Sequence, residues 1–240
     1  MQEKIELLQT YIEEAQNIVF LGGAGVSTEC GIPDFRSQNG LYRQPYDVAP
    51  ETILSISYFH KNPQKFFAFY KDKMNSLTIK PGFTHSFLKQ LETCGKLKAI
   101  ITQNIDGLHE KAGSTNVLEL HGSIYRNYCT HCGKFFSAEE VFHSKNIPMC
   151  SCHHIIKPDV VLYGELLDNS VWEQAEKMVK QADLLIVGGT SLMVYPANSL
   201  LHYFKGQHLV IINQDKTPLD NKANLVIHDK LETVFKQLTI

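Results

Sequence analysis

Short, mostly apolar runs alternate along the chain with longer segments in which apolar positions recur every three or four residues. Each run is followed by a glycine, threonine, asparagine or histidine, and the runs lie at residues 17–21, 97–101, 117–120, 184–187, 208–212 and 224–227. Such short runs predict buried β-strands. The amphipathic segments predict helices near the N-terminus and over residues 81–91, 170–181, 196–204 and 230–238. The alternation predicts a parallel sheet covered by helices on both faces.

Two segments interrupt this alternation and indicate a second, smaller domain. Residues 35–80 are rich in aromatic side chains and are predicted to be helical, and residues 124–157 hold four of the six cysteines. We interpret them as a helical insert and a zinc-binding module that together build the smaller domain. Residues 1–34, 81–123 and 158–240 would then form an α/β domain with a Rossmann-like parallel sheet.

Polar residues and glycines gather where the predicted strands end. These strand ends carry residues 22–25, 103–106, His121, residues 188–191 and Asn213. In open parallel sheets, ligands bind outside the carboxyl ends of the strands. The sequence therefore predicts a ligand site at this edge of the sheet.

The glycine-rich loop at residues 22–25 follows a predicted strand and precedes a predicted helix start at residues 27–29. Glycine lets a backbone approach a ligand closely, and a helix N-terminus offers free N–H groups to a phosphate. The spacing differs from the dinucleotide-binding fingerprint, because Thr28 stands where the last glycine would be. A tight strand-to-helix turn without a ligand explains the loop equally well.

Three further polar features are ambiguous when each is taken alone. Phe35 and Arg36 could form a flap with an aromatic cover and a phosphate-binding guanidinium, or a capped and buried segment. Residues 103–106 could form a pocket of amides and carboxylates, or only a turn. His121, at a strand end before a glycine, could be a general base or a structural histidine.

Composition narrows the class of protein. The chain has 240 residues, of which 43% are hydrophobic and 20% are charged, which is enough for a globular core. A net charge of −2 argues against general nucleic-acid binding. The N-terminal segment is acidic and amphipathic, unlike a signal peptide, and no apolar run has membrane-spanning length. We therefore expect a cytoplasmic protein without a membrane anchor.

Four cysteines form two close pairs, Cys129 with Cys132 and Cys150 with Cys152. Four thiolates can close a tetrahedral zinc site that leaves no open position for chemistry, so we predict one structural zinc ion. The second pair has a single intervening residue, which leaves room for a histidine to assist. The candidates for that role are His131, His153 and His154. A nucleic-acid zinc ribbon is the alternative, but basic residues around the cysteines are only mildly in excess.

In combination, these motifs resemble those of the sirtuins, which are NAD-dependent protein lysine deacylases. The matching blocks follow the family's order and span nearly the whole chain: residues 23–37, 102–109, 119–123, the two cysteine pairs, 156–165, 187–197 and 211–213. The resemblance implies NAD as the cofactor and acylated lysines of proteins as the substrates.

The resemblance also implies a role for each matching position. NAD would be bound by Gly22, Ala24, Gly25, Thr28, Asp34, Phe35, Arg36, Gln103, Asn104, Asp106, Gly189, Ser191 and Asn213. The substrate peptide would contact Tyr70, Lys73, Val161, Leu162, Tyr163, Gly164 and Glu165, with residues 161–165 pairing with it as a strand.

The chemistry implied by the resemblance depends on His121, Asn104 and Asp106. The acyl-lysine oxygen attacks the ribose carbon that bears nicotinamide, nicotinamide leaves, and an alkylamidate forms. His121 is then the general base that activates a ribose hydroxyl against this intermediate. The products are free lysine, nicotinamide and an O-acyl-ADP-ribose.

Some positions depart from the family's pattern. Gly22 replaces a frequent threonine, and the second cysteine pair is shorter than usual. Members that remove succinyl or malonyl groups carry a tyrosine and, three residues later, an arginine. Here Tyr70 matches, but Lys73 replaces the arginine and cannot form a bidentate carboxylate contact. We therefore predict removal of acetyl or other neutral acyl groups.

Two alternatives use the same residues. A mono-ADP-ribosyltransferase would direct a protein nucleophile into the same pocket, and a non-catalytic sensor would only bind NAD or ADP-ribose. The presence of Asn104, Asp106 and His121 together argues against the sensor, because a pure binder needs no base. We expect a monomer.

Overall fold

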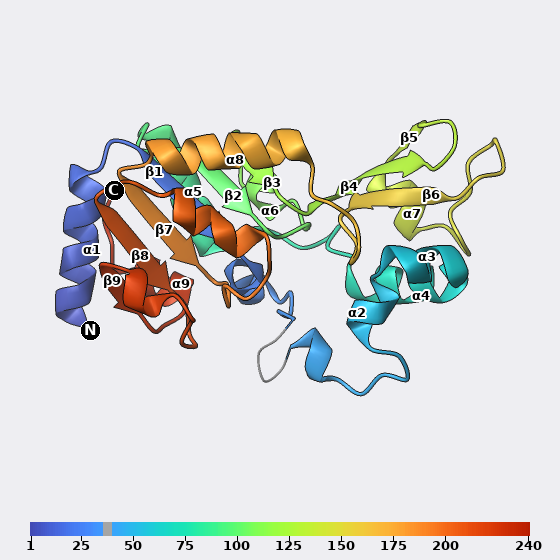
Figure 1. Cartoon of the computed structure of the whole chain (residues 1–240), viewed down its shortest axis with the longest axis horizontal. Coiled ribbons are helices and arrows are strands. Elements are labelled where there is room, and N and C mark those ends of the chain that lie inside the picture. Colours follow the sequence, from blue (N-terminus) through green and yellow to red (C-terminus); the bar gives the residue numbers. More distant parts are fainter. Residues whose placement is uncertain (36–39) are drawn as a thin grey trace.

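The computed structural model describes residues 1–35 and 40–240, which form a large lobe and a small lobe (Figure 1). The large lobe contains a six-stranded sheet in the order β3-β2-β1-β7-β8-β9. Its strands are β1 (Ile18–Gly22), β2 (Leu97–Thr102), β3 (Val117–Glu119), β7 (Leu184–Gly188), β8 (His208–Ile212) and β9 (Leu225–Ile227). All neighbouring strands are parallel. The predicted Rossmann-like fold class is confirmed.

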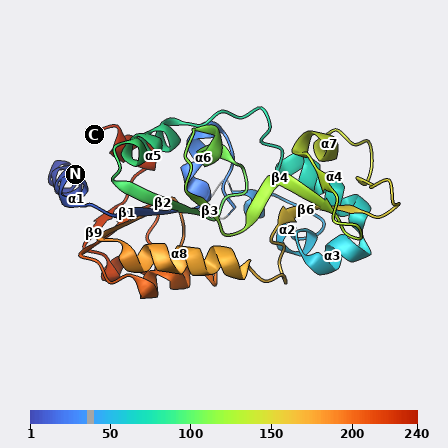
Figure 2. The same ribbon diagram turned by 90° about the horizontal axis from the view of Figure 1, so that it is seen from above.

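Helices cover both faces of this sheet because successive strand residues point to opposite sides. On one face, Ile18 and Phe20 pack with α1 (Gln2–Glu14), α5 (Phe83–Thr93) and α9 (Leu231–Phe235). On the other face, Val19 and Leu21 pack with α8 (Asn169–Gln181) and the 3₁₀ helix η4 (Ala197–Tyr203). Figure 2 shows α5 and α8 on opposite sides of the sheet.

The prediction of a helix that begins at residues 27–29 is wrong. Two single 3₁₀ turns, η1 (Ala24–Val26) and η2 (Thr28–Cys30), follow the glycine loop instead. Gly31 ends the second turn in the left-handed region, with φ at +86°, and Pro33 disfavours helical backbone at Ile32. The helix predicted over residues 196–204 is also a 3₁₀ helix, η4.

The small lobe combines both interrupting segments. The first contributes η3 (Leu41–Arg43), α2 (Pro50–Ile53), α3 (Ile56–Lys61) and α4 (Pro63–Lys73). A three-stranded antiparallel sheet contains β5 (Phe135–Phe136), β4 (Gly122–Cys129) and β6 (Ile156–Val160), with α7 (Ala138–Phe142) beside it. The domain limits that we set at residues 123 and 158 fall inside β4 and β6.

One aromatic core joins the two parts of the small lobe. Phe59, Phe66 and Tyr70 of the helices pack with Ile124 and Phe142 from the other segment. Two short elements complete the described chain, α6 (Leu108–Lys111) after β2 and η5 (Asp220–Lys222) before β9. Among the described residues, no helix is long and apolar enough to span a membrane.

Candidate active site

A cavity of about 1650 Å³ lies between the lobes, at the carboxyl ends of the large sheet. The large lobe lines it with Gly25, Gln103 and Asn213, and the small lobe contributes Tyr70 from α4. The ligand site predicted at the strand ends therefore coincides with the main cavity among the described residues.

Most of the predicted site residues line this one cavity although they are far apart in the sequence. From the cofactor set these are Ala24, Gly25, Thr28, Asp34, Phe35, Gln103, Asn104, Asp106, Gly189, Ser191 and Asn213. From the substrate and catalytic sets they are Tyr70, Lys73, Val161, Leu162, Tyr163, Gly164, Glu165 and His121. Gly22 does not line it, because it is the buried last residue of β1. Arg36 lies outside the described residues.

The glycine loop is held against the end of β7 by direct backbone contacts. Gly23 N–H donates to the carbonyl of Gly188 at 3.2 Å, and Gly25 N–H donates to that of Gly189 at 2.8 Å. A Cβ at Gly25 would lie 2.7 Å from Cα of Gly189. Glycine is therefore required here for the two loops to approach, whether or not a phosphate binds.

A buried network links the loop after β2 to the glycine loop. Ser27 Oγ donates to a carboxylate oxygen of Asp106 at 2.7 Å, and Asn104 Nδ2 donates to Ser27 Oγ at 3.1 Å. Leu108 N–H donates to the second oxygen of Asp106 at 3.0 Å. Burial raises the pKa of Asp106 above its usual range, and the hydrogen bonds from Leu108 and Ser27 oppose that shift. The network fixes Asn104 at the cavity wall.

His121 has a defined tautomer. Its Nδ1 lies 2.9 Å from the backbone carbonyl of Gln103, and because a carbonyl can only accept, Nδ1 carries the proton. Burial lowers the pKa of His121, while the bond to Gln103 raises it. The imidazole is thus neutral at pH 7 and keeps an unprotonated Nε2, which suits a general base. Gln103 is itself oriented by Nε2–H donation to Thr190 Oγ1 at 3.2 Å.

The predicted substrate-binding segment is not a continuous strand. β6 ends at Val160, and Val161 N–H donates to the carbonyl of His121 at 2.9 Å. Glu165 N–H then donates to the carbonyl of Leu162 at 2.9 Å, which closes a turn around Gly164. Gly164 takes a φ of +91°, a value that favours glycine. The Glu165 carboxylate accepts the Leu162 N–H at 2.8 Å.

Tyr163 connects this segment to the helical insert of the small lobe. Its N–H donates to the Leu54 carbonyl at 2.9 Å, and its carbonyl accepts from Ile56 N–H at 3.0 Å. Its hydroxyl lies 2.6 Å from the hydroxyl of Tyr42, whose ring packs against Phe35 at 5.4 Å between centroids. The segment that follows the glycine loop therefore touches the substrate side directly.

Tyr70 and Lys73 differ sharply in environment. Tyr70 is fully buried between Phe66 and Phe142, and its hydroxyl has no hydrogen-bond partner among the described residues. Burial raises the pKa of Tyr70. Lys73 Nζ lies 2.9 Å from the carboxylate of Asp72 and is partly exposed. The ammonium that would meet an acidic acyl chain thus already has an anionic neighbour.

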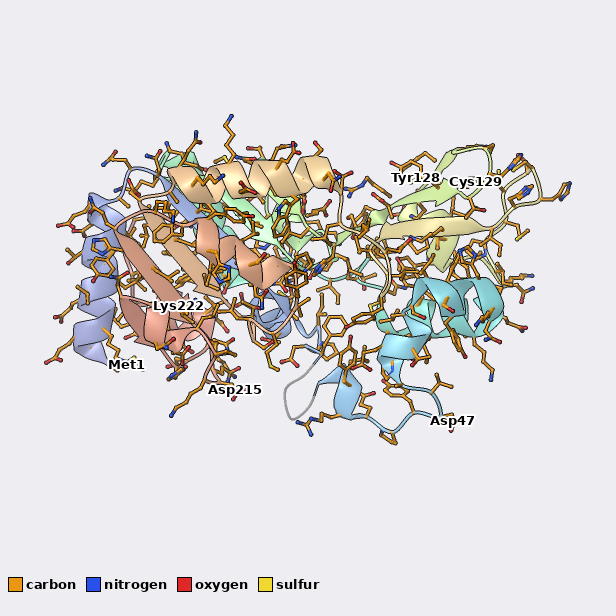
Figure 3. The ribbon with its side chains drawn as sticks, in the orientation of Figure 1. Met1, Asp47, Tyr128, Cys129, Asp215 and Lys222 are labelled. Atoms are coloured by element: carbon orange, nitrogen blue, oxygen red, sulfur yellow. The ribbon has the colours of Figure 1, made fainter. Side chains whose placement is uncertain are left out.

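The four predicted zinc ligands meet at the far end of the small lobe, where Figure 3 labels Cys129. Their Sγ atoms lie within 4.8 Å of one another. Cys129 and Cys152 are 3.3 Å apart, and Cys132 is 3.6 Å from both Cys150 and Cys152. Tetrahedral zinc with four thiolates needs about 3.8 Å between sulfurs, so these residues fit the ion.

The short second pair reaches the site without help from a histidine. His153 N–H donates to the Cys150 carbonyl at 2.9 Å, and His153 takes a φ of +64°, which turns the chain sharply. His131 and His154 stack on each other with centroids 4.2 Å apart and are outside the metal-ligand group found among the described residues. The four cysteines alone can therefore complete the coordination.

Comparison with known proteins gives the family. The Sir2 family matches residues 23–196 of this chain. The chain belongs to the Sir2 family. A protein named NAD-dependent protein deacetylase from Clostridium perfringens (strain 13 / Type A) is 52% identical over 239 residues, with 98% of each chain covered. One of the same name from Staphylococcus aureus (strain Mu50) is 41% identical over 241 residues, with 99% of each covered.

Solved Sir2 structures have the same fold. One, described as a study of the mechanism and regulation of Sir2 enzymes, has a TM-score of 0.91 at 37% identity and covers 99% of this chain and 97% of its own. Another, a Sir2 variant with a deacetylated p53 peptide and 3′-O-acetyl ADP ribose, has a TM-score of 0.90 at 35% identity and covers 97% and 96%.

In this Sir2-family chain, sequence reasoning missed three residues of the site. Ser27 and Thr190 hold Asp106 and Gln103 through hydroxyl groups, and Tyr42 faces Tyr163. Ser27 and Thr190 stand inside the matched blocks, and Thr190 directly follows Gly189, so their position gave a signal. Tyr42 had none, because its partner is distant in the sequence and the contact depends on how the lobes meet.

Proposed function

We propose that this chain removes acetyl groups from lysine side chains of proteins, with NAD as the co-substrate. The observation that carries the proposal is the hydrogen bond of His121 Nδ1 to the Gln103 carbonyl, which directs Nε2 to its base role in the wall of a large cavity that Asn104 and the buried Asp106 also line. The names of the relatives and their high identity support the same reaction.

In this proposal the large lobe holds NAD. The loop of Ala24 and Gly25 lies against the pyrophosphate, and Ser191 and Asn213 take the adenosine half. Gln103, Asn104 and Asp106 take the nicotinamide ribose. Thr28, Asp34, Phe35 and Gly189 complete the wall. Gly22 acts only through the shape of the turn, and Arg36 stays a candidate for the phosphates.

Bound NAD supplies a labile bond between nicotinamide and ribose, and the ribose then receives the acyl group. The chain contributes the base and its alignment. His121 Nε2 accepts a proton from a ribose hydroxyl, and the Gln103 carbonyl stabilises the imidazolium through the Nδ1–H bond of 2.9 Å.

The acylated lysine would enter along residues 161–165. Val161 and Tyr163 use their N–H groups within the protein. A substrate peptide would therefore pair with the N–H groups of Leu162 and Gly164. A peptide that pairs there must displace the Glu165 carboxylate from the Leu162 N–H. We propose that this exchange accompanies β-augmentation by the substrate.

The preferred acyl group is proposed to be acetyl or another neutral chain. Tyr70 lies deep in the aromatic core, and Lys73 is paired with Asp72. An acidic acyl chain would meet a lysine that is partly neutralised and that lacks the bidentate geometry of arginine.

A structural role is proposed for the zinc ion, which the four thiolates of Cys129, Cys132, Cys150 and Cys152 would hold away from the cavity lining. Thiolate ligands must stay reduced, which supports our proposal of a cytoplasmic protein. Cell fractionation tests the compartment, and light scattering on the purified chain tests the proposed monomer.

The decisive experiment incubates an acetyl-lysine peptide with the purified chain, with and without NAD, and identifies the products by mass spectrometry. Deacetylation is expected only with NAD, together with nicotinamide and O-acetyl-ADP-ribose in equal amounts. Gain of an ADP-ribose on the peptide would favour the transferase alternative. Binding of NAD without any product would favour the sensor.

A further inference from the structure

A second group of potential metal ligands lies in the large lobe, apart from the small lobe's four cysteines. Glu29 and Cys30 come from η2, and His85 comes from the first turn of α5. Their ligand atoms all lie within 4.8 Å of one another. These residues, which we call the Glu29–Cys30–His85 cluster, have no part in the proposed deacetylation.

The spacing of the cluster is close to what a small, thiophilic divalent ion needs. Cys30 Sγ lies 3.9 Å from His85 Nδ1. Tetrahedral zinc bonds to sulfur and nitrogen place those atoms about 3.6 Å apart, so closure by a few tenths of an ångström suffices. One thiolate, one imidazole and one carboxylate is a donor set that suits Zn²⁺ or Co²⁺ and leaves a position for a further ligand.

The carboxylate of Glu29 and the imidazole of His85 are each already oriented by a backbone N–H group. Thr84 N–H donates to Glu29 Oε1 at 2.8 Å, and Gly82 N–H donates to His85 Nδ1 at a long 3.3 Å. The carboxylate lies directly on Gly82, where a Cβ would be 2.5 Å from its carboxyl carbon. An ion would replace the long contact from Gly82 at His85 and the contact between Cys30 and His85.

Two buried histidines lie at or beside the cluster, and their unpartnered nitrogens do not include the His85 Nδ1 that faces Cys30. His85 has no measurable exposure and His109, on α6, is 1% exposed, and their ring centroids are 4.8 Å apart. His85 Nε2 and both ring nitrogens of His109 have no hydrogen-bond partner among the described residues. Buried polar atoms without partners are costly, so they mark sites where another group is expected.

From this geometry we propose that Glu29, Cys30 and His85 form a second metal site for a zinc-like divalent cation, distinct from the four-cysteine site. Burial raises the pKa of Cys30 to about 11, so the ion must displace the thiol proton when it binds.

Occupancy would tie η2 to α5. Because Thr28 of η2 lines the main cavity, the ion would lie directly behind the loop that we propose to hold NAD. The metal site itself does not depend on deacetylation, and its test needs no turnover.

The test titrates Co²⁺ into the full chain after its four-cysteine site has been filled with zinc. We expect one equivalent of Co²⁺ to bind with thiolate-to-cobalt charge-transfer absorption in the near ultraviolet, while elemental analysis shows that one zinc per chain stays in place. Cys30→Ala should lose this absorption. Cys94→Ala is the matched control, since Cys94 is an exposed cysteine outside both ligand groups, and it should keep it.

Glu29→Gln gives a milder variant, because its amide oxygen can still accept the Thr84 N–H while the charge is lost. We expect its affinity for Co²⁺ to fall at least tenfold with an unchanged circular dichroism spectrum. The proposal is overturned if wild type shows no thiolate absorption with zinc retained. It is equally overturned if Cys30→Ala and Cys94→Ala bind Co²⁺ alike, or if Glu29→Gln binds as tightly as wild type.

Discussion

The two lobes hold their loops in different ways. In the large lobe, strands with no exposed residues, such as β1 and β7, fix the strand ends, and glycines let those ends touch backbone to backbone. In the small lobe, the sheet has only the three strands β5, β4 and β6. The four cysteines lie at its far end, where β4 finishes at Cys129. Apolar burial therefore positions the catalytic side, whereas metal coordination positions the outer end of the small lobe.

Zinc removal should have the largest effect, because it should unfold the outer end of the small lobe and leave the large lobe intact. Structural zinc contributes roughly 10 kcal/mol or more to the folding of small sites. A strong chelator, or Cys152→Ser, should make residues 129–152 accessible to limited proteolysis while the strands of the large sheet stay protected from hydrogen exchange. Cys94→Ser is the control and should change neither. Cooperative loss of both lobes at once would contradict a separate role for the metal.

An acid titration of activity addresses the large lobe alone. In the proposed mechanism His121 acts as a base, so kcat/KM should fall as the pH drops through the pKa of this residue. Burial lowers that pKa from its usual 6.5, so activity should persist to a lower pH than for an exposed histidine and then fall about tenfold per pH unit. Circular dichroism at each pH separates this loss from unfolding. An acid-side loss of kcat/KM centred well above pH 6.5 would contradict the assignment of His121 as the base.

Gly25→Ala should disturb the contact between the ends of β1 and β7. The added Cβ would lie 2.7 Å from Gly189, so the loops must separate, at a cost of about 1–3 kcal/mol of unfolding free energy. KM for NAD should rise as well. Gly95→Ala is a control for KM only: its Cβ meets nothing within 4 Å, so KM for NAD should stay unchanged, although its φ of +74° makes alanine destabilising there. Both readouts come from denaturation curves and initial rates.

The smallest effect is expected at the acyl end of the cavity. Lys73→Ala should change kcat/KM for an acetyl-peptide less than about threefold, since the exposed pair with Asp72 contributes little. Lys73→Arg should raise the rate on a succinyl-peptide relative to wild type, because arginine can bind a carboxylate in a bidentate way. Preference of the wild type for the succinyl-peptide would refute our assignment of neutral acyl groups.

The strands could be predicted from the sequence because their signal is local. The runs that become β1, β7 and β8 are short, apolar and bounded by glycine or asparagine, and the observed ends differ by one residue at most. The prediction of a helix after Gly25 was wrong, because Gly31 and Pro33 limit that segment to single 3₁₀ turns. The turn at residues 162–165 was missed for a related reason: it depends on the left-handed Gly164 and the reach of Glu165.

The candidate site was predictable where the chemistry lies within a motif. Asn104, Asp106 and His121 lie within four residues of the ends of β2 and β3, so the parallel strands bring them together. Contacts between distant segments gave no local signal. Tyr42 with Tyr163, and Cys30 with His85, meet only because the chain folds back on itself.

The most direct test of the central claim is a comparison of wild type with His121→Ala on an acetyl-lysine peptide, followed by mass spectrometry. The account predicts that wild type forms free lysine and O-acetyl-ADP-ribose only when NAD is present. The variant should bind NAD and fold normally but lose at least about 100-fold in kcat. Turnover without NAD, or full activity in His121→Ala, would contradict it.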